Sequence, residues 1–220
     1  MKRIGIIDYQ LGNLFSVIQA CEKVGINAVL CTEASQLKGL DGYILPGVGS
    51  FGEAMNNMRS CGLDIALKAE VANGKPLFGI CLGLQLLFEK SEESANTTGL
   101  GILKGSVKKF PNRNEADIKI RIPNIGWNSL EFSNGETRRN ENPLSDVSDD
   151  DYFYFVHSYF IETDEIDCIL TYTHYHTVKY VSSVFRNNIF ATQFHPEKSG
   201  EKGLEIYKKW SNLINQKLNE

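Results

Sequence analysis

The amino-acid sequence predicts an α/β protein with a mostly parallel central sheet, helices on both faces of that sheet, and an antiparallel or mixed strand extension in its second half. Two observations predict this fold class. Short apolar strands alternate with amphipathic helices up to about residue 90, whereas strand-like runs dominate after residue 105. We find no internal repeat, low-complexity segment or linker, so residues 1–220 are expected to form a single domain.

In the first half, apolar runs that are short are predicted as strands, and longer runs with helical spacing are predicted as helices. The first helix is typical, because Leu14, Val17, Ile18, Cys21 and Val24 recur at helical intervals. Strands that are apolar throughout indicate a parallel sheet covered on both faces. The predicted elements are strand 3–8, helix 14–24, strand 28–31, a helical turn at 33–38, strand 42–45, helices 53–58 and 63–71, and strand 76–80.

In the second half, polar turns separate runs of β-branched and aromatic residues. Asn134-Gly135 is a strong hairpin signal, and Asn187-Asn188 marks another turn. A final helix over 203–218 has one apolar face. The predicted strands are 105–110, 118–122, 127–132, 152–156, 169–173, 179–185 and 189–194.

Composition excludes several classes of function. The net charge of −4 leaves no basic footprint for nucleic acid, and no apolar run reaches membrane-spanning length. The N-terminal residues 1–8 are predicted to be a first buried strand and not a signal peptide. Five cysteines without a Cys-x-x-Cys pair indicate reduced thiols in a cytoplasmic protein, not a disulfide framework or zinc site. His174 and His176 have no third ligand nearby, so no metal is expected.

The segment Gly79-Ile80-Cys81-Leu82-Gly83 has the pattern of a nucleophile elbow. It follows the apolar run 76–80 and precedes an amphipathic helix, and glycines flank the central residue where backbones crowd. A helix N-terminus favours the thiolate, which is the reactive form of cysteine. A lone cysteine in an apolar stretch is more often a buried hydrophobe. The coincidence of the glycines, the junction and a distant His-x-Glu pair favours a catalytic Cys81.

The segment His195-Pro196-Glu197 supplies what such a cysteine needs. Residues two apart on an extended segment point the same way, so one strand end can present a base and the carboxylate that orients it. A histidine near a strand end is more commonly structural, but a thiolate with an imidazole base suits acyl transfer. We therefore predict a catalytic triad of Cys81, His195 and Glu197.

Acyl transfer also requires N–H donors for the tetrahedral oxyanion. The N–H of Leu82, directly after the nucleophile, is well placed for one donor. The second is expected from the loop Pro46-Gly47-Val48-Gly49, which follows a neighbouring parallel strand, so that Gly47, Val48 and Gly49 are the candidates. Taken alone, that loop is more simply an ordinary turn between a strand and the next element.

These residues closely resemble class I (triad-type) glutamine amidotransferases and, more narrowly, the glutaminase subunits of imidazole glycerol phosphate synthases. The similarity covers nearly the whole chain. The elbow and His-Pro-Glu are shared by many amidotransferases, whereas Gly126-Trp127-Asn128 and the segment 154–159 are more specific. The landmarks are Ile7-Asp8-Tyr9 with Gly12-Asn13-Leu14, Leu45-Pro46-Gly47-Val48-Gly49, Gly79-Ile80-Cys81-Leu82-Gly83-Leu84-Gln85, Ile125-Gly126-Trp127-Asn128, Tyr154-Phe155-Val156-His157-Ser158-Tyr159 and Gln193-Phe194-His195-Pro196-Glu197-Lys198-Ser199.

The resemblance implies a flavodoxin-like fold and a cofactor-free reaction. Cys81 would take the γ-glutamyl group of glutamine, releasing ammonia and then glutamate. Gln85 and the backbone around Ser158 and Tyr159 would hold the amino-acid end of the substrate. The ammonia would pass to a (β/α)8-barrel synthase in a heterodimer, which makes imidazole glycerol phosphate and aminoimidazole-carboxamide ribotide in histidine biosynthesis. The residues implied at the shared interface are Trp127, Asn128, Tyr154 and Lys198; without the family, Trp127 and Tyr154 would be predicted as core aromatics.

Two positions depart from the family pattern. Asn124 stands where the family usually has histidine, and His176 stands where a glycine normally follows Tyr175. Neither belongs to the triad, but both bear on the partner-facing surface. Three alternatives therefore stay open: a paralogous ammonia-supplying subunit for acetamidino-sugar formation in surface-polysaccharide biosynthesis, a stand-alone cysteine hydrolase, and a non-catalytic scaffold.

Overall fold

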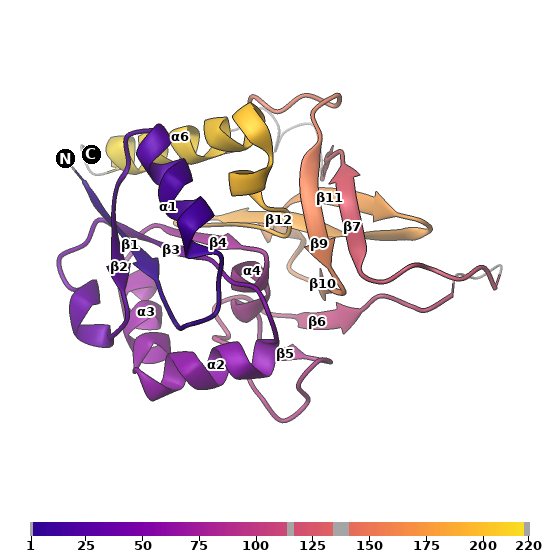
Figure 1. The fold of residues 1–220 in the computed structure, drawn as a ribbon, viewed down its shortest axis with the longest axis horizontal. Coiled ribbons are helices and arrows are strands. Elements are labelled where there is room, and N and C mark those ends of the chain that lie inside the picture. The colour runs from indigo at the N-terminus through magenta and orange to yellow at the C-terminus, as the bar shows by residue number, and fades with distance from the viewer. Residues whose placement is uncertain (1, 114–116, 134–140, 218–220) are drawn as a thin grey trace.

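Five adjacent strands run parallel at the centre of the fold, in the order β2-β1-β3-β4-β13 (Figure 1). The computed structural model describes residues 2–113, 117–133 and 141–217. This strand order is that of flavodoxin-like sheets, with β13 as the fifth strand, so the predicted fold class is confirmed. The parallel strands are β1 (Arg3–Ile7), β2 (Asn27–Cys31), β3 (Gly42–Leu45), β4 (Leu77–Ile80) and β13 (Ile189–Thr192).

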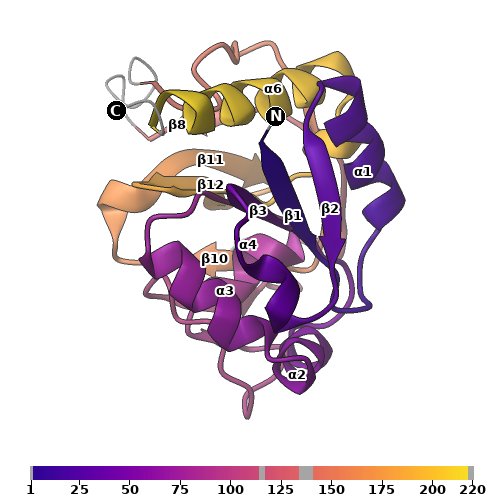
Figure 2. The same cartoon turned by 90° about the vertical axis from the view of Figure 1, so that its left-hand side faces the viewer.

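Helices cover both faces of this sheet, α1 and α6 on one side and α2 and α3 on the other (Figure 2). The strands are buried on both faces because successive side chains enter different cores: Ile44 packs with α1 and α6, whereas Tyr43 and Leu45 pack with α2 and α3. The helices are α1 (Leu14–Lys23), α2 (Phe51–Ser60), α3 (Leu63–Ala72), α4 (Leu82–Leu86) and α6 (Gly200–Lys217), with short 3-10 turns η1 (Ala34–Leu37), η2 (Ile166–Cys168) and η3 (Pro196–Lys198).

The second half of the chain extends the sheet with antiparallel strands. β12 pairs antiparallel with β13 and carries β10 and β11 beside it, and β7 and β9 form a separate antiparallel pair. The predicted mixed extension is therefore confirmed. Its strands are β5 (Lys90–Ser91), β6 (Ser106–Lys109), β7 (Asn124–Asn128), β8 (Glu131–Phe132), β9 (Phe153–His157), β10 (Tyr159–Glu162), β11 (Ile169–Tyr175) and β12 (Val178–Arg186).

Three predictions in the second half were wrong in detail. Residues 118–122 form only an isolated bridge, Lys119 with Arg113, and the strand begins after Pro123, which has no N–H for a ladder. The predicted strand 127–132 is divided, because β7 pairs with β9 whereas β8 pairs with β11 in the main sheet. β10 was not predicted, although its apolar residues fill the gap between β12 and β6. The Asn134-Gly135 hairpin lies outside the described residues.

The tight turn between β11 and β12 places His176 in a left-handed conformation. The turn consists of His176 and Thr177, between the paired residues Tyr175 and Val178, and the φ of His176 is 53°. Glycine is favoured at such a position because it has no Cβ to clash. The glycine of the family pattern therefore reflects backbone conformation at this turn.

Replacing His176 with glycine is expected to stabilise the protein slightly. The left-handed conformation costs a residue with a Cβ roughly 1–2 kcal/mol, whereas the greater freedom of glycine in the unfolded chain offsets roughly 0.5–1 kcal/mol. Urea unfolding should give a small gain in the free energy of unfolding for His176→Gly. Thr177→Gly is the matched control and should lose stability, because Thr177 has no positive φ to relieve. A His176→Gly protein less stable than the parent would contradict this account.

Candidate active site

Cys81 occupies a sharp turn between β4 and α4. Its φ of 54° and ψ of −107° are unusual for a residue with a side chain, and its N–H donates to the Thr192 carbonyl of β13 over 2.7 Å. α4 begins at the next residue, Leu82. Gly83 must lack a side chain, because a Cβ there would collide with the Leu45 carbonyl. This strained strand-turn-helix geometry is that of a nucleophile elbow, as the glycine pattern predicts.

The elbow meets two segments that are distant in sequence. β3, β4 and β13 are adjacent and parallel, with Leu45 opposite Gly79 and Thr192 opposite Ile80. Their carboxyl ends therefore lie at one edge of the sheet, which is where ligands bind in parallel α/β sheets. The loop 46–49, the elbow, and the segment leading to His195 all leave from this edge.

His195 and Glu197 form a buried, hydrogen-bonded pair. Nδ1 of His195 lies 2.7 Å from Oε1 of Glu197, and each side chain is only 2% exposed. A carboxylate only accepts, so Nδ1 carries the proton. The two residues meet across the 3-10 turn η3 and not along an extended strand, so the predicted pairing is confirmed but the reason given for it was wrong.

The other imidazole nitrogen, Nε2, has no hydrogen-bond partner in the described structure. Burial lowers the pKa of His195, but the interactions of its ring with Cys81 and with Glu197 outweigh it and raise that pKa to about 10. His195 is therefore electrostatically coupled to the elbow sulfur. The Ser199 hydroxyl, which donates to the His195 carbonyl over 2.7 Å, and the Tyr154 carbonyl, which accepts the N–H of His195 over 2.9 Å, fix its backbone.

The loop 46–49 is anchored by Tyr9, a residue not predicted to belong to the site. The Tyr9 hydroxyl donates to the Pro46 carbonyl over 2.7 Å. A Cβ on Gly47 would collide with that hydroxyl, and Gly49 adopts a φ of 98°. Burial raises the pKa of Tyr9, which keeps the hydroxyl protonated as a donor. Both glycines are thus required by the path of the loop, and Val48 between them is partly exposed.

A cavity of about 440 Å³ brings the three predicted substrate residues together. Cys81 and Leu82 lie on its wall beside Gln85, Ser158 and Tyr159. The side-chain amide of Gln85 donates to the Tyr159 carbonyl over 3.0 Å, which ties α4 to β10. The full lining is Val48, Gly49, Cys81, Leu82, Gln85, Glu93, Pro123, Val156, His157, Ser158, Tyr159 and Lys198.

Three further residues at this site were not predicted. Glu93 lines the cavity and accepts the N–H of Phe51 over 2.7 Å. Gln193 is fully buried, with its amide nitrogen 3.7 Å from the Cys81 sulfur. His157 is buried beside the cavity, and burial lowers its pKa to about 4, so the ring is neutral near neutral pH. Gln193 and His157 fall within segments that resemble the family, whereas the sequence carries no signal that Glu93 faces the cavity.

Three of the four predicted interface residues form an aromatic and cationic cluster beside His195. The rings of Trp127 and Tyr154 are 5.9 Å apart, and Nζ of Lys198 lies 5.9 Å from the centre of the Tyr154 ring. Tyr154 in turn lies 6.5 Å from the His195 ring. Trp127 is 53% exposed and is not a core aromatic, and Asn128, at the end of β7, is partly exposed.

Asn124 does not face solvent, in contrast to Trp127 on the same strand. It is 1% exposed, and its side-chain amide lies 3.2 Å from both Nε2 of His157 and the Tyr180 hydroxyl. This departure from the family pattern therefore bears on the packing of β7 against the main sheet and not on the exposed face.

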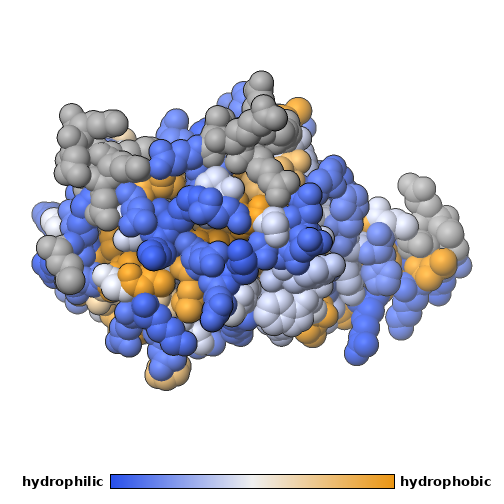
Figure 3. Space-filling view, turned by 90° about the horizontal axis from the view of Figure 1, so that it is seen from above, coloured by the Kyte–Doolittle hydropathy of each residue, from blue (hydrophilic) through white to orange (hydrophobic). Residues whose placement is uncertain are grey.

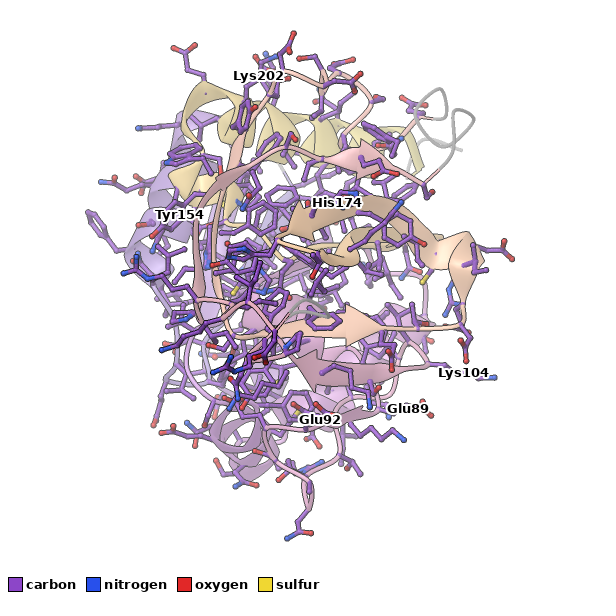
Figure 4. All side chains as sticks on the ribbon, turned by 90° about the vertical axis from the view of Figure 1, so that its right-hand side faces the viewer. Glu89, Glu92, Lys104, Tyr154, His174 and Lys202 are labelled. Carbon is purple, nitrogen blue, oxygen red and sulfur yellow. The ribbon has the colours of Figure 1, made fainter. Side chains whose placement is uncertain are left out.

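A second cavity of about 440 Å³ lies at the β5–β6 edge, lined by Glu89, Lys104 and Glu165 among others. Figure 4 shows Glu89 and Lys104 well separated from Tyr154, which marks the side of the elbow. Glu165 pairs with Arg186 over 3.1 Å, and none of the residues lining this cavity is a cysteine or histidine. The chemistry of the lining therefore favours the first cavity as the active site.

The face seen from above in Figure 3 is mainly hydrophilic, with hydrophobic residues between the polar ones. Among the described residues, no helix combines the length and the apolar character needed to cross a bilayer. Within the same residues, no three side chains of histidine, cysteine, aspartate or glutamate are grouped so as to hold a metal ion.

Comparisons with known proteins agree with this geometry. The family model for glutamine amidotransferase class-I matches residues 5–211. The imidazole glycerol phosphate synthase subunit HisH of Geobacillus sp. (strain WCH70) is 42% identical over 214 residues, covering 97% of this chain and 98% of that relative. The HisH subunit of Bacillus subtilis (strain 168) is 42% identical over 210 residues, covering 96% of each chain.

Solved structures show the same fold at low sequence identity. A crystal structure of a glutamine amidotransferase matches with a TM-score of 0.73 at 19% identity, over 96% of this chain and 98% of that chain. A chain from the structure of PurLQS of Thermotoga maritima matches with a TM-score of 0.71 at 18% identity, over 97% of this chain and 99% of that chain. The family match spans nearly the whole chain and includes the elbow and the histidine–glutamate pair, and the chain belongs to the class-I glutamine amidotransferase family.

Proposed function

We propose that this protein is the glutaminase subunit of an imidazole glycerol phosphate synthase. It hydrolyses glutamine to glutamate and ammonia and supplies the ammonia to a synthase partner in histidine biosynthesis. The observation that carries this proposal is that the Cys81 elbow and the buried His195–Glu197 pair leave the sheet at one edge, where His195 interacts with Cys81. The names of relatives 42% identical over nearly their whole length support the choice of pathway.

In the first half-reaction, the Cys81 thiolate attacks the side-chain carbonyl carbon of glutamine. The C–S bond forms, the C–N bond breaks, and the imidazolium of His195 gives a proton to the departing ammonia. The raised pKa of His195 favours a protonated ring at the start of this step. Glu197 holds the proton on Nδ1 and thereby directs Nε2 toward the reacting atoms.

The oxyanion of the tetrahedral intermediate requires donors close to the elbow. Leu82 is the first residue of α4, and its N–H is one candidate donor to the oxyanion because it directly follows the nucleophile. Gly47, Val48 and Gly49 supply the second, and the anchoring of their loop by Tyr9 supports this role. In the second half-reaction, neutral His195 takes a proton from water, and the resulting hydroxide attacks the thioester and releases glutamate.

The amino-acid end of glutamine binds between α4 and β10. Gln85, Ser158 and Tyr159 line that part of the cavity, as does the carboxylate of Glu93. We assign Glu93 to the α-ammonium group of the substrate, because it is an acidic side chain among the residues that line the cavity. The cavity volume of about 440 Å³ is sufficient for one amino acid.

A (β/α)8-barrel synthase binds over β7 and β9 to form a heterodimer. Ile125 and Trp127, alternate residues on β7, are 59% and 53% exposed. Large apolar side chains exposed together are typical of a protein–protein interface. Asn128, Tyr154 and Lys198 complete this face, and its closeness to His195 supports direct transfer of ammonia into the partner. Five unpaired cysteines support a cytoplasmic location.

The test of this function is the dependence of glutamine hydrolysis on the partner. Glutamate release by the chain alone should be slow, and it should rise about tenfold or more when a barrel synthase and its ribotide acceptor are added. A bound partner makes the site productive, so uncoupled loss of glutamine is avoided. Rapid hydrolysis independent of any partner would contradict the coupling and favour a stand-alone hydrolase. Stimulation only by a synthase that forms an acetamidino sugar would instead assign the subunit to surface-polysaccharide biosynthesis.

A further inference from the structure

We propose that Gln193 is a further catalytic residue of the glutaminase reaction. Its side-chain amide donates a hydrogen bond to the Cys81 thiolate, and it stabilises that thiolate as the leaving group when the thioester breaks. This inference rests on the proposed function. Gln193 is fully buried and lies next to the elbow through the pairing of β13 with β4. Its amide nitrogen is 3.7 Å from the sulfur, and it is not among the residues that line the substrate cavity.

The direction in which this amide points is fixed by a chain of hydrogen bonds. The Tyr159 carbonyl can only accept, so the group of Gln85 that lies 3.0 Å from it must be the amide NH₂. The same NH₂ lies 3.1 Å from the side chain of Gln193, so the group of Gln193 that faces it must be the oxygen. The NH₂ of Gln193 is then the end that faces the sulfur.

His157 strengthens the anchor of this chain. Its Nδ1 lies 2.8 Å from the Tyr159 carbonyl and therefore donates to it. The side chains of Gln193, Gln85 and His157 are 0%, 5% and 6% exposed, and the hydrogen bond between the two glutamines is buried, so water does not compete for it. An amide flip at Gln193 would place its NH₂ group against the NH₂ group of Gln85, and is excluded by the network.

A donor directed at the sulfur stabilises the thiolate, because a hydrogen bond to a charged group is stronger than one to a neutral group. This interaction is lost when the C–S bond forms, and it is regained when water attacks the thioester and the C–S bond breaks with its electron pair on sulfur. The imidazolium regenerated in that step is the second partner of the sulfur. Gln193 should therefore accelerate deacylation more than acylation.

The test is Gln193→Met, studied in the assembled complex with its synthase partner and acceptor. Deacylation should slow, so kcat should fall about tenfold to hundredfold, the loss expected for one charge-assisted hydrogen bond. Apparent KM should fall with it and leave kcat/KM close to the parent value, because KM falls when an acyl-enzyme accumulates. Mass spectrometry of acid-quenched turnover should detect the glutamyl thioester on Cys81.

Gln193→Glu is the second variant, since it keeps the size of the side chain and an oxygen for Gln85 but replaces the donor at the sulfur with a carboxylate. It should also accumulate thioester. Thr173→Val is the matched control, because it removes the hydrogen bond of a buried hydroxyl to the Ser129 carbonyl, and Thr173 lies on β11, a strand that pairs with neither β4 nor β13. It should not accumulate thioester.

Three outcomes would overturn the inference: an unchanged kcat in Gln193→Met, a fall in kcat/KM without thioester, or equal thioester in Thr173→Val. Failure of the proposed function looks different, because the parent complex itself would then release no glutamate from glutamine. If Gln193→Met does not fold, the thioester level in Gln193→Glu decides.

Discussion

Replacing Cys81 with alanine is expected to lower glutamine-dependent product formation by the complex at least about 10⁴-fold, while ammonia-dependent formation continues. The variant has no atom at the elbow to form the thioester, whereas ammonia supplied from solution bypasses the glutaminase site. The measurement is product formation by the complex with glutamine and with an ammonium salt, in parallel. The glutamine-dependent rate reports the role of the Cys81 nucleophile, and the ammonia-dependent rate reports whether the complex is otherwise intact.

The control for this experiment is Cys61→Ala, since Cys61 is the one cysteine that is not buried. Both of its activities should remain at the parent level. Labelling supplies an independent check, because a diazoketone analogue of glutamine should modify Cys81 before the other four cysteines. A well-assembled Cys81→Ala complex that also loses its ammonia-dependent activity would show that this chain does more than produce ammonia.

Replacing Glu197 with glutamine should lower kcat by about 10³–10⁴-fold with little change in KM. Glu197 now fixes the proton of His195 on Nδ1 through the 2.7 Å contact. An amide can present its NH₂ to that nitrogen, which leaves the proton on Nε2 and removes the base from the reacting side. The substrate contacts at Gln85 and Glu93 are untouched. Steady-state glutamate release measures both constants.

The same substitution should change the response of stability to pH. The pKa of His195, about 10 in the folded protein, lies above its ordinary value, so the stabilising contribution of this group is present below pH 6.5 and is lost as the pH rises through 10. Without the Glu197 carboxylate the pKa of His195 falls, so the stabilising contribution of His195 begins to be lost at a lower pH. Urea unfolding between pH 6.5 and 10 measures the difference.

Glu201→Gln is the matched control for both measurements, since it removes a carboxylate from the first turn of α6 and leaves His195 and its partner in place. Its kcat and its pH profile should match those of the parent. A Glu197→Gln enzyme with kcat within tenfold of the parent would mean that the imidazole needs no carboxylate to hold its tautomer.

The local structure around the elbow was predictable because it is encoded over a few residues. Gly79 and Gly83 mark the crowded turn, the apolar run before them marks β4, and the periodic run after them marks α4. The alternation of elements in the first half likewise gave the parallel sheet. The β7–β8 segment was not predictable in the same way, since one apolar run serves two sheets and the division depends on partners elsewhere in the chain.

The site shows the same division. The histidine–glutamate pair and the glycine-rich loop could be found from residue type and spacing. Glu93 and Tyr9 could not, because each acts through a contact of long sequence separation: Glu93 with Phe51, and Tyr9 with Pro46. Trp127 illustrates the opposite case, since residue type alone predicts a core aromatic, whereas the structure leaves it half exposed beside Tyr154.

The sequence by itself determined the elements of the first half, the elbow and the chemistry of its cysteine, since turns, caps and hydrophobic periodicity are set by neighbouring residues. The tertiary structure alone decided which distant side chains complete the site. Strand pairing places the carboxyl ends of β3, β4 and β13 at one edge, although more than a hundred residues separate the elbow from His195. Hydrogen-bond direction is also a property of the assembled network, which is why the orientation of Gln193 toward the sulfur follows only from its contact with Gln85 and, through it, with Tyr159.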